Sequence, residues 1–389
     1  MLFLSMLILY IAAMIFLVFT IRKWLSAVAA ETNRRIPSRL SLLALVPAAL
    51  PIAGAFCHPA FSPYLLTRAG NLWLCFCLYL FLSLIVLFAA RSICRHAKKT
   101  RSGIRRPRLL AGTIIIVLCA LITAGGVFHA FQTKTTRYTI QSEKLTNGPI
   151  RIVFAADLHL GSQVGLTQVQ AMVTRINEAN PDLVLFGGDI FDSSYDSVSD
   201  PALIAGALRR IQSKYGVYTV YGNHDVSETL VGGFSISPEQ YAFRDPRMAE
   251  FLSMSGIQTL ADQTVSLADG SVCLAGRLDG EKAGDGTSNR LSIPQLMEKI
   301  DPNAFVIALE HEPVDLEELG AGGADLVLCG HTHDGQYFPA NLIQKLLWNN
   351  SFGLKKFGAM TSIVTAGFGL YGPPVRIGTD SEIVQIDVE

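Results

Sequence analysis

Five short polar motifs follow directly after apolar runs in the part of this 389-residue chain that begins at Pro149. They hold carboxylates, one asparagine and imidazoles, the side chains that bind divalent metals and move protons near pH 7. Taken singly, each motif could instead be a helix cap, a turn or a satisfied core group. In chain order the motifs are Asp157-Leu158-His159, Gly187-Gly188-Asp189, Gly222-Asn223-His224-Asp225, Glu310-His311-Glu312-Pro313 and Gly330-His331-Thr332-His333.

The distribution of histidines favours one shared site over five coincidences. The chain has eight histidines, and His58, His96 and His129 lie before Pro149. All the others belong to the five motifs. A series of this kind, with each motif at the end of an apolar run, predicts that the motifs meet in space.

The chemistry of the donors indicates the kind of site. The motifs offer oxygen and nitrogen ligands without a thiolate, which suits Mn, Fe, Co or Zn ions. The number of candidates exceeds the needs of one metal with an open position. It fits two divalent metal ions sharing a carboxylate, an arrangement that activates hydroxide for attack on phosphorus and neutralises phosphoryl oxygens. We therefore expect two divalent metal ions, whose identity the sequence leaves open.

Alternating strands and helices must position these motifs. In open α/β sheets, ligands bind at the carboxyl ends of the strands, which is where each motif begins. The mixture of β-α-β units and hairpins predicts a mixed sheet or pair of sheets flanked by helices. We expect helices at Thr167–Asn180 and from Pro201 and Ser292, and strands at Ile150–Ala156, Leu183–Phe186, Val217–Tyr221, Val265–Leu267, Ser271–Ala275, Phe305–Leu309, Leu326–Cys329, Ile363–Ala366 and Glu382–Val388.

The N-terminal third predicts a membrane anchor. Only 16% of the chain is charged, against about a quarter in a typical soluble protein. Apolar runs near 1–21, 40–56, 72–90 and 109–131 predict about four transmembrane helices, each close to the ~20 residues that cross a bilayer. We therefore expect an anchor at 1–131, a linker at 132–148 with one short strand, and a catalytic domain at 149–389.

Basic residues between the apolar runs predict the topology. They gather at 22–39 and 91–108, and only Arg68 lies between the second and third runs. Positively charged loops stay in the cytoplasm. We therefore expect a multi-pass protein of the cell membrane with the catalytic domain outside the cytoplasm. A headgroup or nucleic-acid patch at 91–108 is the alternative.

The series DxH, GD, GNHD, H and GHTH resembles the calcineurin-like metallophosphoesterase superfamily. It is most similar to membrane-associated bacterial phosphodiesterases related to lipid-A-precursor hydrolases. The resemblance runs from Ile150 to the C-terminus and implies an α/β (α+β) sandwich of two mixed β-sheets flanked by helices. It also implies residue roles. Asp157, His159 and His333 would hold the first metal, Asn223, His311 and His331 the second, and Asp189 would bridge them.

The resemblance implies roles for His224 and Asp225, and it draws attention to Asp334 and Arg376. His224 would contact the phosphate and protonate the leaving oxygen, and Asp225 would orient it. Asp334 replaces a glycine that the branch usually has, and we expect its side chain to face solvent. Arg376 is a candidate substrate-binding residue that would contact phosphate, with a surface salt bridge as the alternative.

The segment Tyr337–Phe357 mixes apolar and aromatic residues with three lysines. Such a composition suits a surface that dips into a membrane interface. A lid packed on the domain's own core is the alternative.

Together these features predict a metal-dependent phosphoesterase that cleaves a phosphodiester in a lipid headgroup or cell-envelope molecule. The alternative is a membrane sensor or binding module that keeps the metal site without turnover. Transport is disfavoured because the apolar runs lack buried charge. No nucleic-acid partner is expected, because no basic, aromatic-laced groove is evident outside Tyr337–Phe357.

Overall fold

The computed structural model describes residues 2–33, 35–56, 63–97, 108–145, 148–231, 234–236, 243–284 and 290–389. Some residues used in the predictions lie outside these ranges: Arg34, Cys57, His58, Lys98, Lys99, Arg101, Arg105, Arg106 and Asn147. The chain forms two compact units. One comprises Met1–Val127 with Leu230–Ile236 and Gly372–Pro374, and the other comprises the rest. Each unit is described by itself.

The first unit is built on long apolar helices. These are α1 (Leu2–Thr32), α4 (Pro63–Ala97) and α5 (Arg108–Ala130). Among the described residues, three helices are long and apolar enough to cross a membrane, over Leu7–Thr32, Leu65–Ala90 and Leu109–Ala130. Their apolar surfaces are largely exposed, as lipid contact requires.

The span expected near 40–56 has a different structure. It is divided into a 3₁₀ helix, η1 (Ser38–Ala44), and two short helices, α2 (Leu45–Ala48) and α3 (Leu50–Phe56). Pro47 and Pro51 lack the backbone N–H that a continuous helix needs, which explains the division. Strands β5 (Leu230–Val231) and β6 (Phe234–Ser235) of this unit form a small antiparallel pair.

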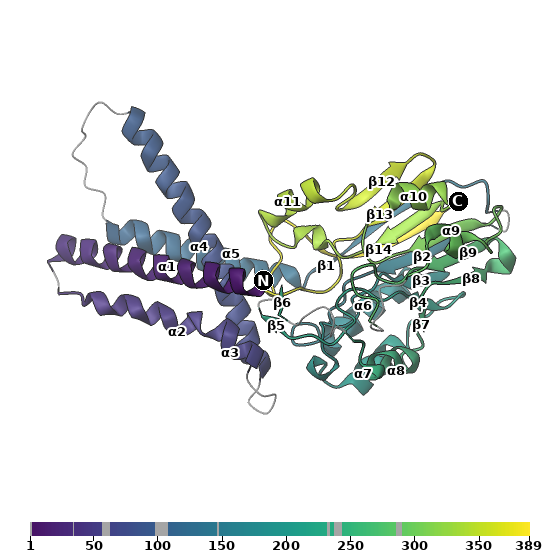
Figure 1. The fold of residues 1–389 in the computed structure, drawn as a ribbon, viewed down its shortest axis with the longest axis horizontal. Coiled ribbons are helices and arrows are strands. Elements are labelled where there is room, and N and C mark those ends of the chain that lie inside the picture. The colour runs from purple at the N-terminus through teal and green to yellow at the C-terminus, as the bar shows by residue number, and fades with distance from the viewer. Residues whose placement is uncertain are drawn as a thin grey trace. The chain divides into compact units, whose positions relative to one another are not determined.

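The second unit contains two six-stranded mixed sheets (Figure 1). The first has the order β1-β14-β2-β3-β4-β7, with β14 antiparallel to β2 and the other pairs parallel. Its strands are β1 (Thr133–Ile140), β2 (Ile150–Ala155), β3 (Leu183–Phe186), β4 (Val217–Thr219), β7 (Gln258–Thr259) and β14 (Ser381–Val388).

The second sheet has the order β12-β13-β11-β10-β9-β8. Its outer pairs, β12–β13 and β8–β9, are antiparallel and its inner pairs are parallel. The strands are β8 (Gln263–Leu267), β9 (Val272–Gly276), β10 (Phe305–Leu309), β11 (Leu326–Cys329), β12 (Gly353–Phe357) and β13 (Met360–Val364).

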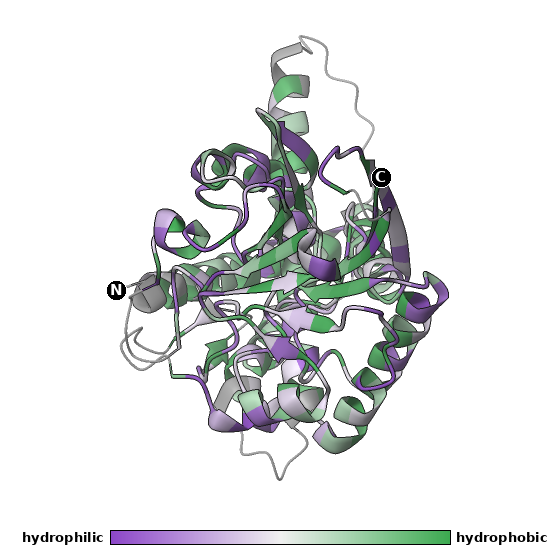
Figure 2. Cartoon of the chain, turned by 90° about the vertical axis from the view of Figure 1, so that its right-hand side faces the viewer, coloured by the Kyte–Doolittle hydropathy of each residue, from purple (hydrophilic) through white to green (hydrophobic). Residues whose placement is uncertain are grey.

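Three apolar layers hold the unit together. Alternate residues of the two sheets, such as Phe154 and Ile307, form the layer between them. The outer face of the first sheet packs on α6 (Leu166–Glu178), α7 (Pro201–Leu208) and α8 (Pro246–Met254). The outer face of the second packs on α9 (Ile293–Met297) and α10 (Leu316–Ala321). Strands in the middle of the domain are accordingly green, the apolar colour, in Figure 2. The predicted sandwich of two mixed sheets flanked by helices is confirmed.

Two segments of this unit differ from the sequence-based expectation. The short strand expected within 132–148 is β1, which begins at Thr133 and pairs with β14 over eight residues. The segment Tyr337–Phe357 contains helix α11 (Ala340–Leu347) and strand β12. No residue of α11 is buried, so α11 is not packed on the domain's own core as a lid would be.

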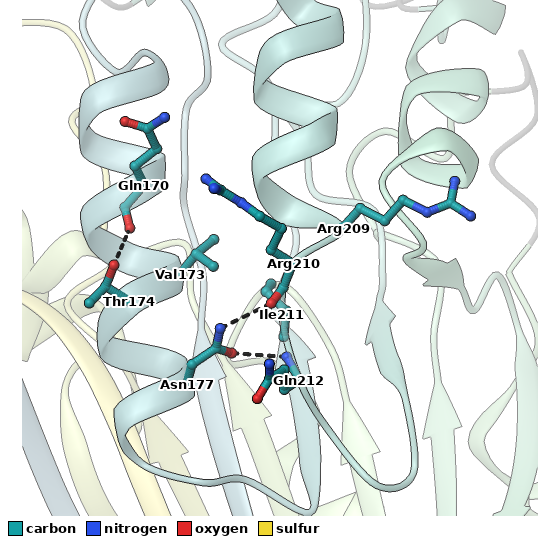
Figure 3. A pocket seen from close by; sticks show the side chains of 8 residues that line it. All are labelled: Gln170, Val173, Thr174, Asn177, Arg209, Arg210, Ile211 and Gln212. Carbon is teal, nitrogen blue, oxygen red and sulfur yellow. Dashed lines mark hydrogen bonds between the residues drawn. The ribbon is translucent and has the colours of Figure 1, made fainter.

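A surface hollow of about 740 Å³ lies between α6 and the segment after α7 (Figure 3). The Asn177 side chain spans it by donating to the carbonyl of Arg210 and accepting from the amide of Gln212. It contains no residue of the five motifs, so we place the candidate site elsewhere.

Candidate metal centre

The first group of predicted ligands meets where β2 and β11 end. Asp157 and His159 follow β2, and His333 lies in the turn after β11. The Nε2 atoms of His159 and His333 are 3.0 Å apart. Asp157 Oδ1 lies 3.9 Å from the His333 Nε2. All three side chains are buried, so they can supply three ligand atoms to one ion.

The second group meets beside the first. His311 Nε2 lies 3.0 Å from Asn223 Oδ1 and 3.3 Å from His331 Nδ1. The distance from His331 Nδ1 to Asn223 Oδ1 is 3.1 Å. One oxygen and two nitrogens from three different loops thus converge on one point.

Asp189, which follows β3, lies between the two groups. Its Oδ2 is 3.2 Å from His311 Nε2 and 3.8 Å from His159 Nε2. Its Oδ1 accepts a hydrogen bond from the amide of His224 at 2.7 Å. This position suits a carboxylate shared by two ions, the role that the family resemblance implied.

The donor set fits metal ions. Ring nitrogens that face one another at 3.0 Å bring two lone pairs together unless a proton or cation lies between them. Asp157 Oδ2 is buried without a hydrogen-bond partner, a costly state that a cation would relieve. The donors are imidazoles, carboxylates and one amide oxygen, as the sequence predicted for Mn, Fe, Co or Zn.

Outer contacts orient the predicted ligands. His311 Nδ1 donates to the carbonyl of Gly187 at 2.8 Å, if Nε2 is the nitrogen left to bind metal. Such a contact fixes the tautomer and the ring direction of a metal-binding histidine. His159 Nδ1 lies 3.6 Å from Asp192 Oδ1, beyond hydrogen-bond distance, and neither atom has another hydrogen-bond partner among the described residues. Sequence reasoning missed Asp192, although it stands only three residues after Asp189 in the same loop.

The backbone at the site is strained. Five predicted ligands have positive φ angles, which non-glycine residues rarely adopt: Asp157 (55°), His159 (46°), Asp189 (51°), His331 (70°) and His333 (52°). Gly222 is required for a different reason, because a Cβ there would collide with Asp189 and His311. Strained backbone of this kind persists only where many surrounding contacts hold it in place, as they do at functional sites.

His224 is buried next to the two groups, and its ring lies 5.3 Å from that of His159. Its Nδ1 forms a 2.7 Å hydrogen bond with Ser193 Oγ. The Asp225 carboxylate does not contact this ring, since it accepts from the amides of Phe191 and Gly222. Asp225 therefore positions His224 through the backbone of the loop, and Ser193, absent from the sequence prediction, holds the ring.

Burial and neighbouring charges set the pKa values in the site. Burial raises the pKa of Asp189, but the opposing charges of His311 and His224 bring it well below its ordinary value. Burial lowers the pKa of His224 to about 4 and that of His331 to about 3. Neutral imidazole is the form that binds metal, so low pKa values favour that role at His331.

Two predictions about residues near the site were wrong. Arg376 is completely buried, and its guanidinium donates to the carbonyls of Ala366, Gly367, Gly369 and Asp380. Its side chain is not exposed to solvent and instead ties together the loop after β13. Asp334 does not face solvent, because only 8% of it is exposed, and burial raises its pKa to about 6.

One further aromatic residue lies at the site. The ring of Tyr371 is 5.0 Å from that of His224 and 5.8 Å from that of His159. Its backbone is paired with the side chain of Gln336, which accepts from the Tyr371 amide and donates to its carbonyl. No motif pointed to Tyr371, because it comes into position only through the folding of the loop before β14.

Comparison with known proteins agrees with this geometry. Residues 150–335 match the model of the calcineurin-like phosphoesterase family. A transmembrane protein with metallophosphoesterase domain from Danio rerio is 32% identical over 301 residues, 73% of this chain and 63% of that protein. An uncharacterized metallophosphoesterase from Bacillus subtilis is 28% identical over 303 residues, 72% of this chain and 95% of that protein.

The chain thus spans less than two thirds of the length of the Danio rerio relative. The name of that relative and the three apolar helices of this chain support association with a membrane. The family predicted from the five motifs is confirmed: the chain carries a calcineurin-like metallophosphoesterase domain.

Proposed function

We propose that this chain is a membrane-anchored, metal-dependent phosphodiesterase that acts on a lipid headgroup or another cell-envelope molecule. One observation carries the proposal. Two groups of buried ligand atoms, centred on the His159–His333 pair and on Asn223, His311 and His331, flank Asp189. Beside them stands His224, a histidine that belongs to neither group and can serve the leaving group.

The seven predicted ligands are the residues that would hold two divalent ions. Such ions, when bound, supply an activated water and neutralise charge on the phosphoryl oxygens. Buried Asp157 and Asp189 bring negative charge that balances the ions. The strained loops hold the ligands in place before substrate arrives, so little reorganisation is needed during the reaction.

His224 is proposed to serve the leaving oxygen. Its Nδ1 is engaged by Ser193, which leaves Nε2 to donate a proton. Burial keeps the isolated ring neutral near pH 7 because its pKa is about 4. The negative charge of a bound phosphate favours the protonated ring, so the proton would be available when substrate is present.

The proposal includes the arrangement of the chain. The anchor occupies 1–131. The segment 132–148, expected to be a linker, contributes β1 to the first sheet and so belongs with the catalytic domain 149–389. The basic loops lie in the cytoplasm and the catalytic domain lies outside it, as the positive-inside rule indicates. Cysteine labelling in intact cells at Glu143, which is exposed, and at positions near Arg101 in the sequence would test this orientation, since only the former should react with an impermeant reagent.

Purified full-length protein loaded in turn with Mn²⁺, Fe²⁺ and Zn²⁺ provides the test of activity. We expect hydrolysis of bis-p-nitrophenyl phosphate, faster than that of p-nitrophenyl phosphate, with at least one metal. Asp189→Asn should abolish it. Asp269→Asn, the same change at an exposed hairpin carboxylate, should leave it intact.

Two results would overturn the proposal. Activity that survives Asp189→Asn would show that the described site is not the catalytic one. Tight binding of metal and phosphate without turnover would identify a sensor or binding module.

A further inference from the structure

Helix α11 and its flanks carry several exposed apolar side chains. On the helix, Leu342 and Ile343 are 51% and 54% exposed, and Leu346 and Leu347 are 86% and 69% exposed. These positions follow an i, i+1, i+4, i+5 pattern, so they share one side of the helix, while Gln344 and Lys345 lie on the other. Phe338, Phe352 and Leu354, on either side of α11 in the sequence, are also exposed.

The surrounding structure holds this segment in place, so its exposure is built into the fold. At its start, the amide of Phe338 donates to the carbonyl of Ile377. Gly335 is needed here, because a Cβ at this residue, whose φ is +71°, would collide with the backbone of Ala340 and Asn341. At its end, Thr332 Oγ1 donates to the carbonyl of Ser351 at 2.6 Å.

The charged residues of this segment have one sign. From Tyr337 to Phe357 the chain contains Lys345, Lys355 and Lys356 and no aspartate or glutamate. Strand β12, which carries two of these lysines, is an edge strand of the second sheet. Apolar residues flanked by lysines match the two layers of a bilayer surface, acyl chains below and anionic headgroups above.

The segment is also connected to the candidate metal centre. Trp348 directly follows α11, and its ring lies 5.3 Å from the ring of His331 in an edge-to-face arrangement. The apolar surface therefore begins one residue from a contact with a predicted ligand. A substrate whose acyl chains rest on α11 has its polar part next to the metal site.

We propose that α11, with Phe338, Phe352 and Leu354, docks on the surface of a lipid bilayer and that the metal site takes amphiphilic phosphoesters from it. The occupant is a bilayer because the same chain carries three helices that are able to cross one. The part about substrate rests on the proposed phosphodiesterase function, whereas the docking itself does not.

Photocrosslinking tests the docking. The full chain is placed in nanodiscs of phosphatidylethanolamine and phosphatidylglycerol with Leu346→p-benzoylphenylalanine. The control is the same replacement at Leu203, which is 58% exposed on α7. We expect at least fivefold more lipid adduct from position 346, and less when phosphatidylcholine replaces phosphatidylglycerol. Equal adducts at both positions, or crosslinks from 346 mainly to a second copy of the chain, would overturn the proposal.

Kinetics test the substrate class. The double variant Leu346→Ser with Leu347→Ser is compared with Leu203→Ser. We expect hydrolysis of soluble bis-p-nitrophenyl phosphate to stay within twofold of the parent in both. Hydrolysis of a diacylglycerol p-nitrophenyl phosphodiester in vesicles should fall at least tenfold in the α11 variant alone. If the α11 variant lost the same fraction of its rate on both substrates, the proposal would be overturned. If the parent protein hydrolyses neither substrate, the proposed function fails, and the adducts still decide the docking.

Discussion

Ser193 Oγ lies 2.7 Å from Nδ1 of His224, and both side chains are buried beside the candidate metal centre. This hydrogen bond fixes the direction of the imidazole and decides which ring nitrogen is left for a substrate. The hydrogen bond to the ring thus comes from a hydroxyl, whereas the carboxylate of Asp225, which the resemblance implied would orient His224, accepts from the amides of Phe191 and Gly222.

Ser193→Ala should lower kcat about tenfold with little change in KM, because the ring loses its orientation rather than its contact with substrate. The measurement is steady-state hydrolysis of an alkyl phosphodiester, whose basic leaving oxygen depends on His224, across pH, where we also expect the ionisation assigned to His224 to move. A change in KM alone would contradict a positioning role.

His224→Ala should have an effect that depends on the leaving group. General acid catalysis contributes about 10²–10⁴ in rate, and it is needed most when the leaving oxygen is basic. We expect a loss of this size for an alkyl phosphodiester and a much smaller one for a p-nitrophenyl ester. Metal content, measured by mass spectrometry, should be unchanged. Equal losses on both esters would rule out the acid role.

Asp192→Asn should weaken metal binding. Its carboxylate lies 3.6 Å from Nδ1 of His159, and loss of such an outer contact typically costs about 10- to 100-fold in metal affinity or activity. Metal retention during dialysis against a graded chelator measures this. The matched control is Asp196→Asn in the same loop, whose side chain is 68% exposed and pairs with Arg247. If both variants retain metal equally, Asp192 does not support the site.

Arg376→Leu should destabilise the catalytic domain by about 3 kcal/mol or more, because four buried carbonyls lose a charged donor. Pulse proteolysis in urea measures the change. Arg151→Leu is the control. Its half-exposed side chain pairs with Asp387, and an exposed ion pair of this kind contributes about 1 kcal/mol or less. If Arg376→Leu lost substrate affinity but kept its stability, the interpretation of Arg376 as a phosphate-binding residue would be restored.

Asp245 caps the N-terminus of α8, and the stabilisation that it gives this helix depends on pH. It accepts hydrogen bonds from the Arg247 side chain and amide, which lower its pKa. The pKa of Asp245 is lower in the folded state than in the unfolded state. The stabilisation is therefore complete when the pH lies above the unfolded-state pKa, and it disappears as the pH falls through the folded-state pKa. Asp245→Ala should cost about 1 kcal/mol at pH 7, seen as faster hydrogen exchange in α8, and almost nothing in strong acid. Asp245→Asn, which keeps the capping oxygen, should lose only the pH dependence.

The sequence predicted the strands that carry the motifs well. Leu183–Phe186, Phe305–Leu309 and Leu326–Cys329 have the predicted bounds, because short apolar runs between polar turns admit few other structures. The motifs at their ends converge although they come from both sheets: Asp157 follows β2 of the first sheet and His333 follows β11 of the second. The family resemblance, rather than the strand pattern, assigned these two ligands to one metal.

Features that depend on tertiary contacts could not be predicted in this way. Arg376 looks like a surface cation until the loop after β13 closes around it, and Asp334 looks like a turn residue until α11 covers it. Ser193 has no motif of its own, since serine is common in loops. The proline-bearing apolar stretch at 40–56 has the composition of a span, but its backbone is divided into short helices.

The pairing of β14 with both β1 and β2 has a consequence for the order of events during synthesis. Among the described strands, β1 pairs with β14 alone, and β2 lacks a neighbour on that side until Ser381–Val388 has left the ribosome. All seven predicted metal ligands are made earlier than this strand. The nascent domain thus holds its complete set of ligands before β14 is available to join β1 to β2.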